Sequence, residues 1–303
     1  ILYSTPPITF TRLVARLKKK SKSVSYLLLK DIFPQNAIDL ELIRSGGLIH
    51  KYLRRQEKKM YEVSDFIGCM SQANADYVKK NNPEIAPEKV EINPNSHELF
   101  EEAISYEEKK RIRVSHNIPE KATLFIYGGN LGKPQGVDFI IDFLNAQKNN
   151  PEVFIVIIGS GTEFLKLKSW FDYIKPMNEK LLSELSKKEY NKLLQSGDVG
   201  MIFLDGRFTV PNFPSRLLSY LEYKLPVLAS TDINTDLGKT LTENEFGLWS
   251  ESGDLITLSQ NVNRLADSEE LRQIMGRNGF NYFITHYTVN NSYKIIMSHF
   301  DPA

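Results

Sequence analysis

Residues 211–230 read PNFPSRLLSYLEYKLPVLAS, which is a loop marked by two prolines, then an amphipathic helix, then a short apolar strand. Pro211 and Pro214 cannot continue a preceding helix, and proline suits a first helical turn. The leucines that follow recur at roughly helical spacing, which predicts a helix packed on a sheet; they are Leu217, Leu218, Leu221 and Leu225. A strand after such a helix is typical of a parallel sheet, so this stretch predicts an α/β fold.

The start of this helix carries groups that suit a phosphate. Amides of a first helical turn have no partners within the helix, and the positive end of the helix dipole lies there. Ser215 adds a hydroxyl, and Arg216, which falls off the leucine stripe, adds a planar cation that can donate two parallel hydrogen bonds. An ordinary helix whose Arg216 faces water fits the same residues, and both interpretations stay open at this point.

The composition is that of an ordinary soluble protein. The chain has 303 residues, 41% apolar and 25% charged, which is long enough for two domains. A net charge of +1 gives no reason to expect nucleic acid as a partner. Cys69 is the only cysteine, which excludes an internal disulfide and fits a reducing, cytoplasmic compartment. The five histidines are scattered, so we expect no protein-held metal.

The first part of the chain alternates short strands with helices. A strand is predicted before Pro6, a basic helix over Phe10 to Lys20, and a buried strand that ends near Asp31. Ligands of parallel sheets bind beyond the carboxyl ends of the strands. Asp31 is therefore either a binding or catalytic carboxylate or, as we favour, a cap of the following turn.

Residues 48–64 predict one long helix with a cationic side. Its apolar and charged residues fall on different sides, the first being Leu48, Tyr52, Met60 and Val63 and the second Lys51, Arg55, Lys58 and Glu62. A cationic side of this kind can dock on anionic lipid headgroups, although most such sides are simply solvated.

Beyond a charged connection at about residues 101–121, apolar strands that run into glycines alternate with helices. Glycine at a strand end lets main-chain amides approach a ligand closely; the glycines in question are Gly128, Gly129, Gly132, Gly159 and Gly161. Neither the Walker pattern nor the dinucleotide GxGxxG pattern is present, which argues against an NTPase and an NAD enzyme. From Leu255 on, the chain reads as helical.

Four segments of the second part together resemble the C-terminal domain of bacterial glycosyltransferases of family four, of the kind that assemble capsular and O-antigen polysaccharides. They are YGGNLGKPQGVD, VIIGSG, KKEYNKLLQSGDVGMIFLD and FPSRLLSYLEYKLPVLASTD. STPPIT and LLLKDIFPQNA resemble the later half of the N-terminal domain of the same proteins.

This resemblance implies a GT-B fold, in which two Rossmann-like domains with parallel sheets face a cleft. The expected division is a partial acceptor-side domain over residues 1–118, a nucleotide-sugar domain over 119–285, and a C-terminal helix over 286–303 that can cross back to the first domain. Such proteins normally have a glycine-rich loop and several strands before the STPP segment, so we expect the acceptor-side domain to be incomplete in these 303 residues.

The family's binding positions carry over as follows. Donor phosphates are expected at Gly129, Asn130, Leu131, Gly132 and Lys133, the nucleotide between Gly159 and Gly161, and the base near Leu185. The segment for the donor sugar, phosphate and ribose contains Asn212, Phe213, Ser215, Arg216 and Ser219. Asp31 lies on the acceptor side, and no residue is assigned as catalytic.

Several positions depart from the family pattern. Pro211 and Ser219 stand where many members have two glutamates. Asn130 and Gln135 replace a common Arg and Lys of the phosphate loop, so we expect Lys133 and Arg216 to neutralise more of the donor's charge. Lys30 stands where many members have a His before the residue that corresponds to Asp31. The positions that depart from the family pattern are thus Lys30, Asn130, Gln135, Pro211 and Ser219.

The resemblance implies retaining transfer of a sugar, with a UDP-sugar favoured as donor, to a glycan or polyprenyl-linked acceptor in cell-surface polysaccharide synthesis. No metal or other cofactor is expected, and the enzyme would work in the cytoplasm or at the inner face of the membrane. Two alternatives remain: a non-catalytic nucleotide-sugar-binding subunit that needs a partner chain, and a nucleotide-sugar epimerase.

Overall fold

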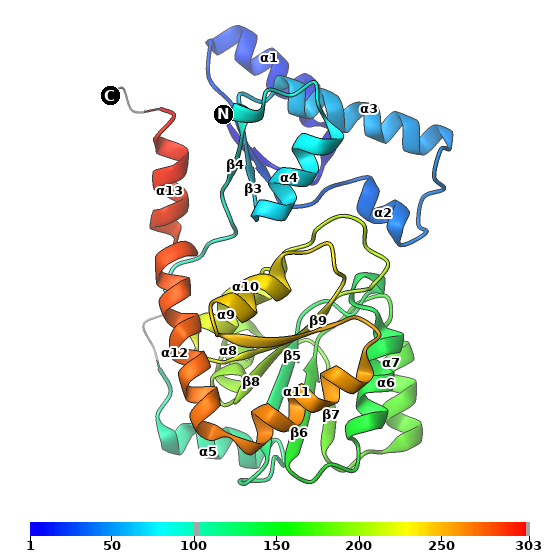
Figure 1. The fold of residues 1–303 in the computed structure, drawn as a ribbon, viewed down its shortest axis with the longest axis vertical. Helices are drawn as coiled ribbons and strands as arrows, with labels where there is room; N and C mark the ends of the chain where they lie inside the picture. Colours follow the sequence, from blue (N-terminus) through cyan, green and yellow to red (C-terminus); the bar gives the residue numbers. More distant parts are fainter. Residues whose placement is uncertain (100–102, 301–303) are drawn as a thin grey trace.

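The computed structural model describes residues 1–99 and 103–300, which build two parallel sheets of four and six strands. Figure 1 shows the smaller sheet with its helices above the larger one, and the C-terminal helices running along one side of both. The predicted α/β fold with two sheet-based units is confirmed. Across the described residues, no helix is long and apolar enough to cross a membrane.

The first sheet has the order β1-β2-β3-β4. Its strands are β1 (Leu2–Ser4), β2 (Tyr26–Leu29), β3 (Phe66–Cys69) and β4 (Val90–Ile92). Its helices are α1 (Thr11–Ser21), α2 (Gln35–Asp39), α3 (Leu48–Val63) and α4 (Gln72–Asn81). All four elements predicted for this part of the chain are therefore present. They are the strand before Pro6, the helix over Phe10 to Lys20, the strand before Asp31 and the helix over residues 48–64. Apolar runs bounded by proline or charge are strong local signals, which is why they were readable.

Helix α3 differs from its prediction in which residues it buries. Met60 and Tyr61 are completely buried, but Leu48 is 86% and Tyr52 57% exposed. Glu57 is buried instead, because its carboxylate accepts hydrogen bonds from the Arg54 guanidinium and the Tyr61 hydroxyl. The expected apolar side is thus buried only toward the end of the helix, and its first turns expose apolar side chains to solvent.

The second sheet has the order β10-β9-β8-β5-β6-β7. Its strands are β5 (Thr123–Gly128), β6 (Val153–Ile158), β7 (Glu179–Leu182), β8 (Val199–Phe203), β9 (Val227–Thr231) and β10 (Gly247–Glu251). The chain proceeds outward from β5 to β7, returns to β8 beside β5, and proceeds outward the other way. This order is that of a Rossmann sheet, whose ligands bind at the carboxyl ends where the direction reverses, here between β5 and β8.

Side chains of this sheet alternate between two cores. Leu124 and Ile126 of β5 join one core, and Phe125 and Tyr127 join the other. The covering helices are α6 (Val137–Gln147), α7 (Phe164–Ile174), α8 (Lys187–Gln195), α9 (Arg216–Glu222), α10 (Leu237–Glu243) and α11 (Leu255–Asp267). Three elements of the second unit were not predicted, because they lie in polar stretches of the chain. They are the strands β7 and β10 and the helix α10.

Helix α5 (Tyr106–Ser115) packs beside the second sheet. Arg113 forms an ion pair with Asp198 and donates to the Ser196 carbonyl at the end of α8 (3.0 Å). The predicted domain boundary at residue 118 therefore falls after a helix that makes these contacts with the second unit.

The last helices, α12 (Glu269–His286) and α13 (Val289–Met297), connect the two units, as Figure 1 shows. Beyond α13, the His299 ring stacks on Phe66 of β3, with 3.7 Å between ring centroids, and its Nε2 lies 2.9 Å from Glu91 of β4. Ser292 of α13 hydrogen-bonds the Asn93 side chain (2.7 Å). The C-terminal segment thus contacts the edge of the first sheet.

Candidate functional site

The carboxyl ends of β5 and β8, where the second sheet changes direction, are the expected place for a ligand. The chain leaves β5 through Gly129 and leaves β8 through Leu204 and Asp205. The Asp205 amide donates to the Pro134 carbonyl at 3.0 Å, so the loop after β5 lies against the end of β8. This region contains the predicted phosphate loop.

The two glycine loops pack on each other through their main chains. The Gly129 amide donates to the Ile158 carbonyl (2.9 Å), and the Leu131 amide donates to Ser160 (2.8 Å). Gly159 has φ +156°, and a Cβ there would lie 1.9 Å from the Gly129 carbonyl oxygen. Only glycine fits at residue 159, so the structure brings the predicted pair of loops together at one edge.

Arg216 lies directly beside the first of these loops. Its guanidinium carbon is 4.4 Å from the centroid of the Tyr127 ring and 3.4 Å from the place a Cβ would take on Gly129. Nη1 of Arg216 is inaccessible to solvent and has no hydrogen-bond partner among the described residues. The guanidinium thus packs on the Tyr127 ring instead of extending freely into water, while part of the residue stays exposed. A buried cationic donor with an unused hydrogen is what an incoming anion would complete.

The surroundings of Arg216 are aromatic rather than acidic. Burial raises the pKa of Tyr127, and it raises the pKa of Tyr190 to about 12, although the positive charge of Arg216 acts in the opposite direction on both. Both phenols are therefore neutral at ordinary pH. The groups that act on the Arg216 guanidinium are tyrosines, and no carboxylate in the described part of the chain pairs with it.

The start of α9 differs from its prediction. The helix has only seven residues, and Ser215 makes no side-chain cap. The Leu217 and Leu218 amides already donate to Pro214 (3.2 Å) and Ser215 (3.1 Å). These tight-turn bonds occupy two of the amides that were expected to be unpaired. Attraction for an anion at this point therefore comes from the guanidinium more than from the helix.

Asn130 and Gln135, the two neutral residues of the predicted phosphate loop, bond to each other. The Asn130 amide nitrogen donates to Gln135 Oε1 (3.1 Å), which also accepts from the Gly132 amide (3.0 Å). The Tyr127 hydroxyl donates to the Asn130 carbonyl (2.6 Å). These bonds set the shape of the loop, within which Lys133 is exposed.

Other predicted residues serve the core or the loops. The Leu131 side chain is fully buried in the core, so only its main chain is available to a ligand. Phe213 is likewise buried, 6.3 Å from the Tyr287 ring centroid. Asn212 donates to Val210 (3.3 Å). Leu185 and Ser219 are partly buried, and Ser215, Gly129 and Gly161 are exposed.

Asp31 lies in the first unit, at the carboxyl end of β2. Its amide and carbonyl both bond the Thr5 hydroxyl, and burial raises the pKa of its carboxyl group. The N-cap of α2 is Pro34, without a side-chain capping bond, so the favoured interpretation of Asp31 as a cap is wrong.

The loop between β8 and α9 is held by the first unit, which sequence reasoning missed. The Asp39 carboxylate accepts from the Thr209 amide (2.7 Å), and the Asn74 amide nitrogen donates to the Pro211 carbonyl (2.6 Å). Phe208 and Val210 are buried in the core of the first unit. The start of α9 is thereby positioned from both units.

Comparisons with known proteins agree with this geometry. A family model described as glycosyl transferases group 1 matches residues 108–282, which contain every strand of the second sheet. The probable glycosyltransferase WbjE of Pseudomonas aeruginosa is 22% identical over 245 residues, which cover 80% of this chain and 59% of that protein. The chain thus spans 59% of the length of this curated relative.

Solved structures share the fold at low identity. Alr3699/HepE of Anabaena in complex with UDP has a TM-score of 0.79 at 13% identity, over 98% of this chain and 78% of that one. The same protein with UDP-glucose has a TM-score of 0.78 at 14% identity, over 98% and 78% of the two chains. WaaG, a glycosyltransferase involved in lipopolysaccharide biosynthesis, has a TM-score of 0.65 at 13% identity, over 96% and 81%.

Proposed function

This chain belongs to the group 1 glycosyl transferases and has the GT-B fold, and from that premise we propose that it transfers a sugar from a UDP-sugar to a glycan or polyprenyl-linked acceptor. The proposal of UDP is supported by the HepE structures, which contain UDP and UDP-glucose. The involvement of WaaG in lipopolysaccharide biosynthesis supports a product in cell-surface polysaccharide, such as capsule or O-antigen.

The observation that carries the proposal is the position of Arg216. Its guanidinium lies against Gly129, at the carboxyl edge where the sheet changes direction, with Nη1 buried and unpaired among the described residues. A diphosphate laid along the first glycine loop would meet this cation and the main chain of residues 129–132 together. The exposed Lys133 is the second cation at the same loop.

In the proposed reaction the acceptor oxygen bonds to the anomeric carbon and the bond from that carbon to the donor phosphate breaks. The acceptor proton is released, and the sugar keeps its anomeric configuration. Negative charge grows on the departing nucleoside diphosphate, and Arg216 and Lys133 stabilise it more strongly than in the bound donor. The proposal includes no metal ion, and it assigns no residue as general base.

The proposal also places the enzyme at the inner face of the membrane. The exposed apolar residues of α3 include Leu48 (86%), Ile49 (66%) and Tyr52 (57%), and Lys51 and Arg55 lie on the same turns. Apolar side chains flanked by cations suit an interface with anionic lipid. A polyprenyl-linked acceptor would be met at such a surface.

Calorimetry of UDP, GDP and their sugars binding to this chain, with magnesium and with EDTA, tests the donor site. We expect UDP to bind equally well in both buffers. Arg216→Ala should weaken that binding roughly 10- to 150-fold, because a charge-assisted hydrogen bond contributes about 1.5 to 3 kcal/mol. Arg216→Lys keeps the positive charge but loses the planar guanidinium. Its affinity for UDP should therefore lie between those of the wild type and Arg216→Ala.

The matched control is Arg277→Ala, which removes an exposed arginine of α12. If Arg277→Ala and Arg216→Ala weaken the binding of UDP equally, Arg216 does not contact the diphosphate. If a folded protein binds no nucleotide at all, the nucleotide-sugar assignment fails. Binding of donor without transfer to any glycan or lipid-linked acceptor would support the non-catalytic alternative.

A further inference from the structure

A cavity lies at the opposite edge of the six-stranded sheet from Arg216. It has a volume of about 640 Å³ and lies between α5 and α12, with both helices contributing to its lining. Thr123, the first residue of β5, lines it, as do Asp198 and Pro226, which immediately precede β8 and β9. Since the strands are parallel, these residues mark the amino edge of the sheet. The glycine loops lie at the carboxyl edge, so the two places are separate.

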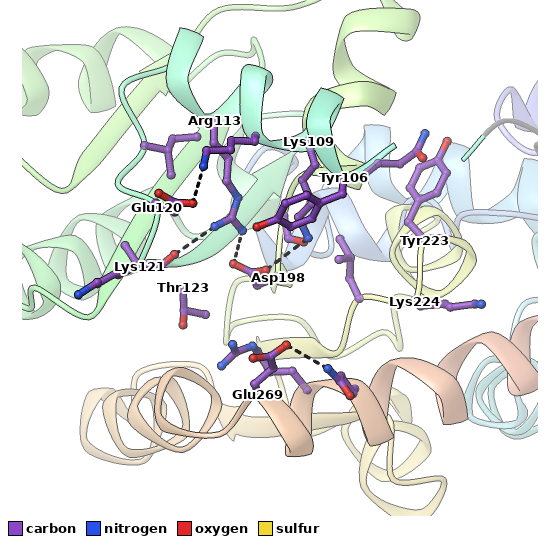
Figure 2. A pocket seen from close by; sticks show the side chains of 18 of the residues that line it. Tyr106, Lys109, Arg113, Glu120, Lys121, Thr123, Asp198, Tyr223, Lys224 and Glu269 are labelled. Carbon is purple, nitrogen blue, oxygen red and sulfur yellow. Dashed lines mark hydrogen bonds and ion pairs between the residues drawn. The ribbon is translucent and has the colours of Figure 1, made fainter. Parts of the chain in front are cut away.

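Cationic side chains line this cavity from both walls. Figure 2 shows Lys109 and Arg113 extending from α5 toward Asp198, with Glu269 on the facing wall. Arg272 belongs to α12 and also lines the cavity. The full set of charged residues in the lining is six cations, Lys109, Lys110, Arg113, Lys121, Lys224 and Arg272, against three carboxylates, Glu120, Asp198 and Glu269.

The carboxylates do not balance these cations. Glu120 pairs with Lys110 (2.9 Å), and Asp198 is shared between Arg113 and Lys109, the latter at 3.6 Å. Glu269 accepts a hydrogen bond from Gln273 (3.0 Å). Arg272 donates to the carbonyls of Leu265 and Ala266, and no ion pair is found for it among the described residues. Six cations against three carboxylates leave an excess of positive charge in the lining, even though the Lys224 ammonium lies over the Phe280 ring, outside the lining.

The cations also repel one another across the cavity. Burial lowers the pKa of Lys109, and the positive charges of Arg113 and Arg272 lower it further, against the opposite influence of Asp198. An anion between the two walls would relieve this repulsion and would be less screened than at an open surface.

We propose that this cavity is a second anion site, which binds a soluble small molecule that carries a phosphate or diphosphate group between Lys109 and Arg113 of α5 and Arg272 of α12. The volume lies within the range of small-molecule pockets, roughly 300 to 1,000 Å³. Tyr106 and Tyr223 also line the cavity and offer aromatic faces for the rest of the ligand.

A soluble ligand is favoured over a lipid headgroup by position. Figure 1 shows α5 at the end of the molecule opposite α3, which is the helix that exposes apolar side chains beside cations. The two ends of β5 reach the two sites, with Thr123 at this cavity and Gly128 at the glycine loops. The site is independent of the donor assignment.

Calorimetric titration of inorganic pyrophosphate into the chain tests the site, with UDP added only to the concentration that saturates the donor site, so that the glycine loops are filled and the cavity stays available. We expect binding that weakens as NaCl is raised. The variant Lys109→Gln with Arg272→Gln should lose at least tenfold in affinity for pyrophosphate and keep its affinity for UDP. Lys188→Gln with Arg277→Gln is the matched control, since it removes one exposed lysine and one exposed arginine outside the cavity.

Thermal unfolding checks that the variants are folded. Arg272 bonds two carbonyls, so Lys109→Gln alone is included, because Lys109 bonds only one carbonyl, that of Gly197. A partial loss in this single variant supports the site. The proposal is overturned if the wild-type chain binds no pyrophosphate beside UDP, or if the double variant and its control bind it equally. Absence of UDP binding would count against the donor site alone, since the comparison of variants stands without it.

Discussion

Tyr127 holds Arg216 at the glycine loop, and removing its ring should weaken the binding of UDP through Arg216. The ring lies under the guanidinium at 4.4 Å, and its hydroxyl donates to Asn130 of the loop. A cation–π contact contributes about 0.5 to 2 kcal/mol and a neutral hydrogen bond about 1 kcal/mol. Tyr127→Phe, which keeps the ring, should therefore raise the Kd for UDP roughly fivefold. Tyr127→Leu should raise it a further two- to thirtyfold.

A double-mutant cycle separates the ring from the rest of the change. In the Arg216→Ala background, Tyr127→Leu should weaken the binding of UDP no more than Tyr127→Phe does, because no cation is left above the ring. The assay is UDP calorimetry at matched concentrations of folded protein, since Tyr127 is fully buried and its truncation also lowers stability. If Tyr127→Leu weakens UDP by the same factor with and without Arg216, the ring does not act through Arg216 and the account of the site is wrong.

Two further predictions concern the second sheet and α3. Burial raises the pKa of Glu179 from 4.5 to about 8, so the unfolded chain ionises first, and the free energy of unfolding should fall as pH rises between these values. The free energy of unfolding of Glu179→Gln, measured in urea, should not fall in this way. The difference between the variant and the wild type should therefore grow by about 1.4 kcal/mol per pH unit. Parallel pH profiles of the two proteins would contradict this prediction. Replacing the exposed Leu48 and Ile49 by serine should reduce sedimentation with anionic phosphatidylglycerol vesicles, whereas Ile256→Ser, at a 74% exposed residue of α11, should not. Equal sedimentation of all three proteins, or equal binding to neutral vesicles, would remove α3 from the membrane surface.

Much of the fold was readable because its signals are local. The strands that precede the glycine loops are continuous apolar runs, and both are completely buried in the structure. The two loops were expected on one edge because parallel strands end together, and the loops do pack on each other. Strand β7 gave no such signal, since its buried residue is Glu179 rather than an apolar one.

Contacts between distant segments were not readable. The Asp39 carboxylate bonds Thr209 and Val210 across the two units, and nothing in either local sequence indicates the pairing. Burial of charge was equally hidden. Arg216 and Glu222 fall off the leucine stripe, yet Glu222 is 6% exposed and Arg216 turns toward Tyr127. Helical spacing shows which side chains are apolar, but a charged side chain lies inside when its neighbours offer a ring or a partner.

The position of Arg216 gives a physical reason why neutral residues can stand in the phosphate loop. Asn130 and Gln135 bond each other and shape the loop, so neither brings charge to it. The cation arrives instead from α9, across the sheet, and it reaches the loop because Gly129 has no side chain where the guanidinium lies, 3.4 Å from the would-be Cβ. A glycine at the end of β5 and an arginine at the start of α9 therefore act as one feature. The positive charge at this loop comes from a residue that is distant from it in sequence. It therefore cannot be predicted from the residues of the loop alone.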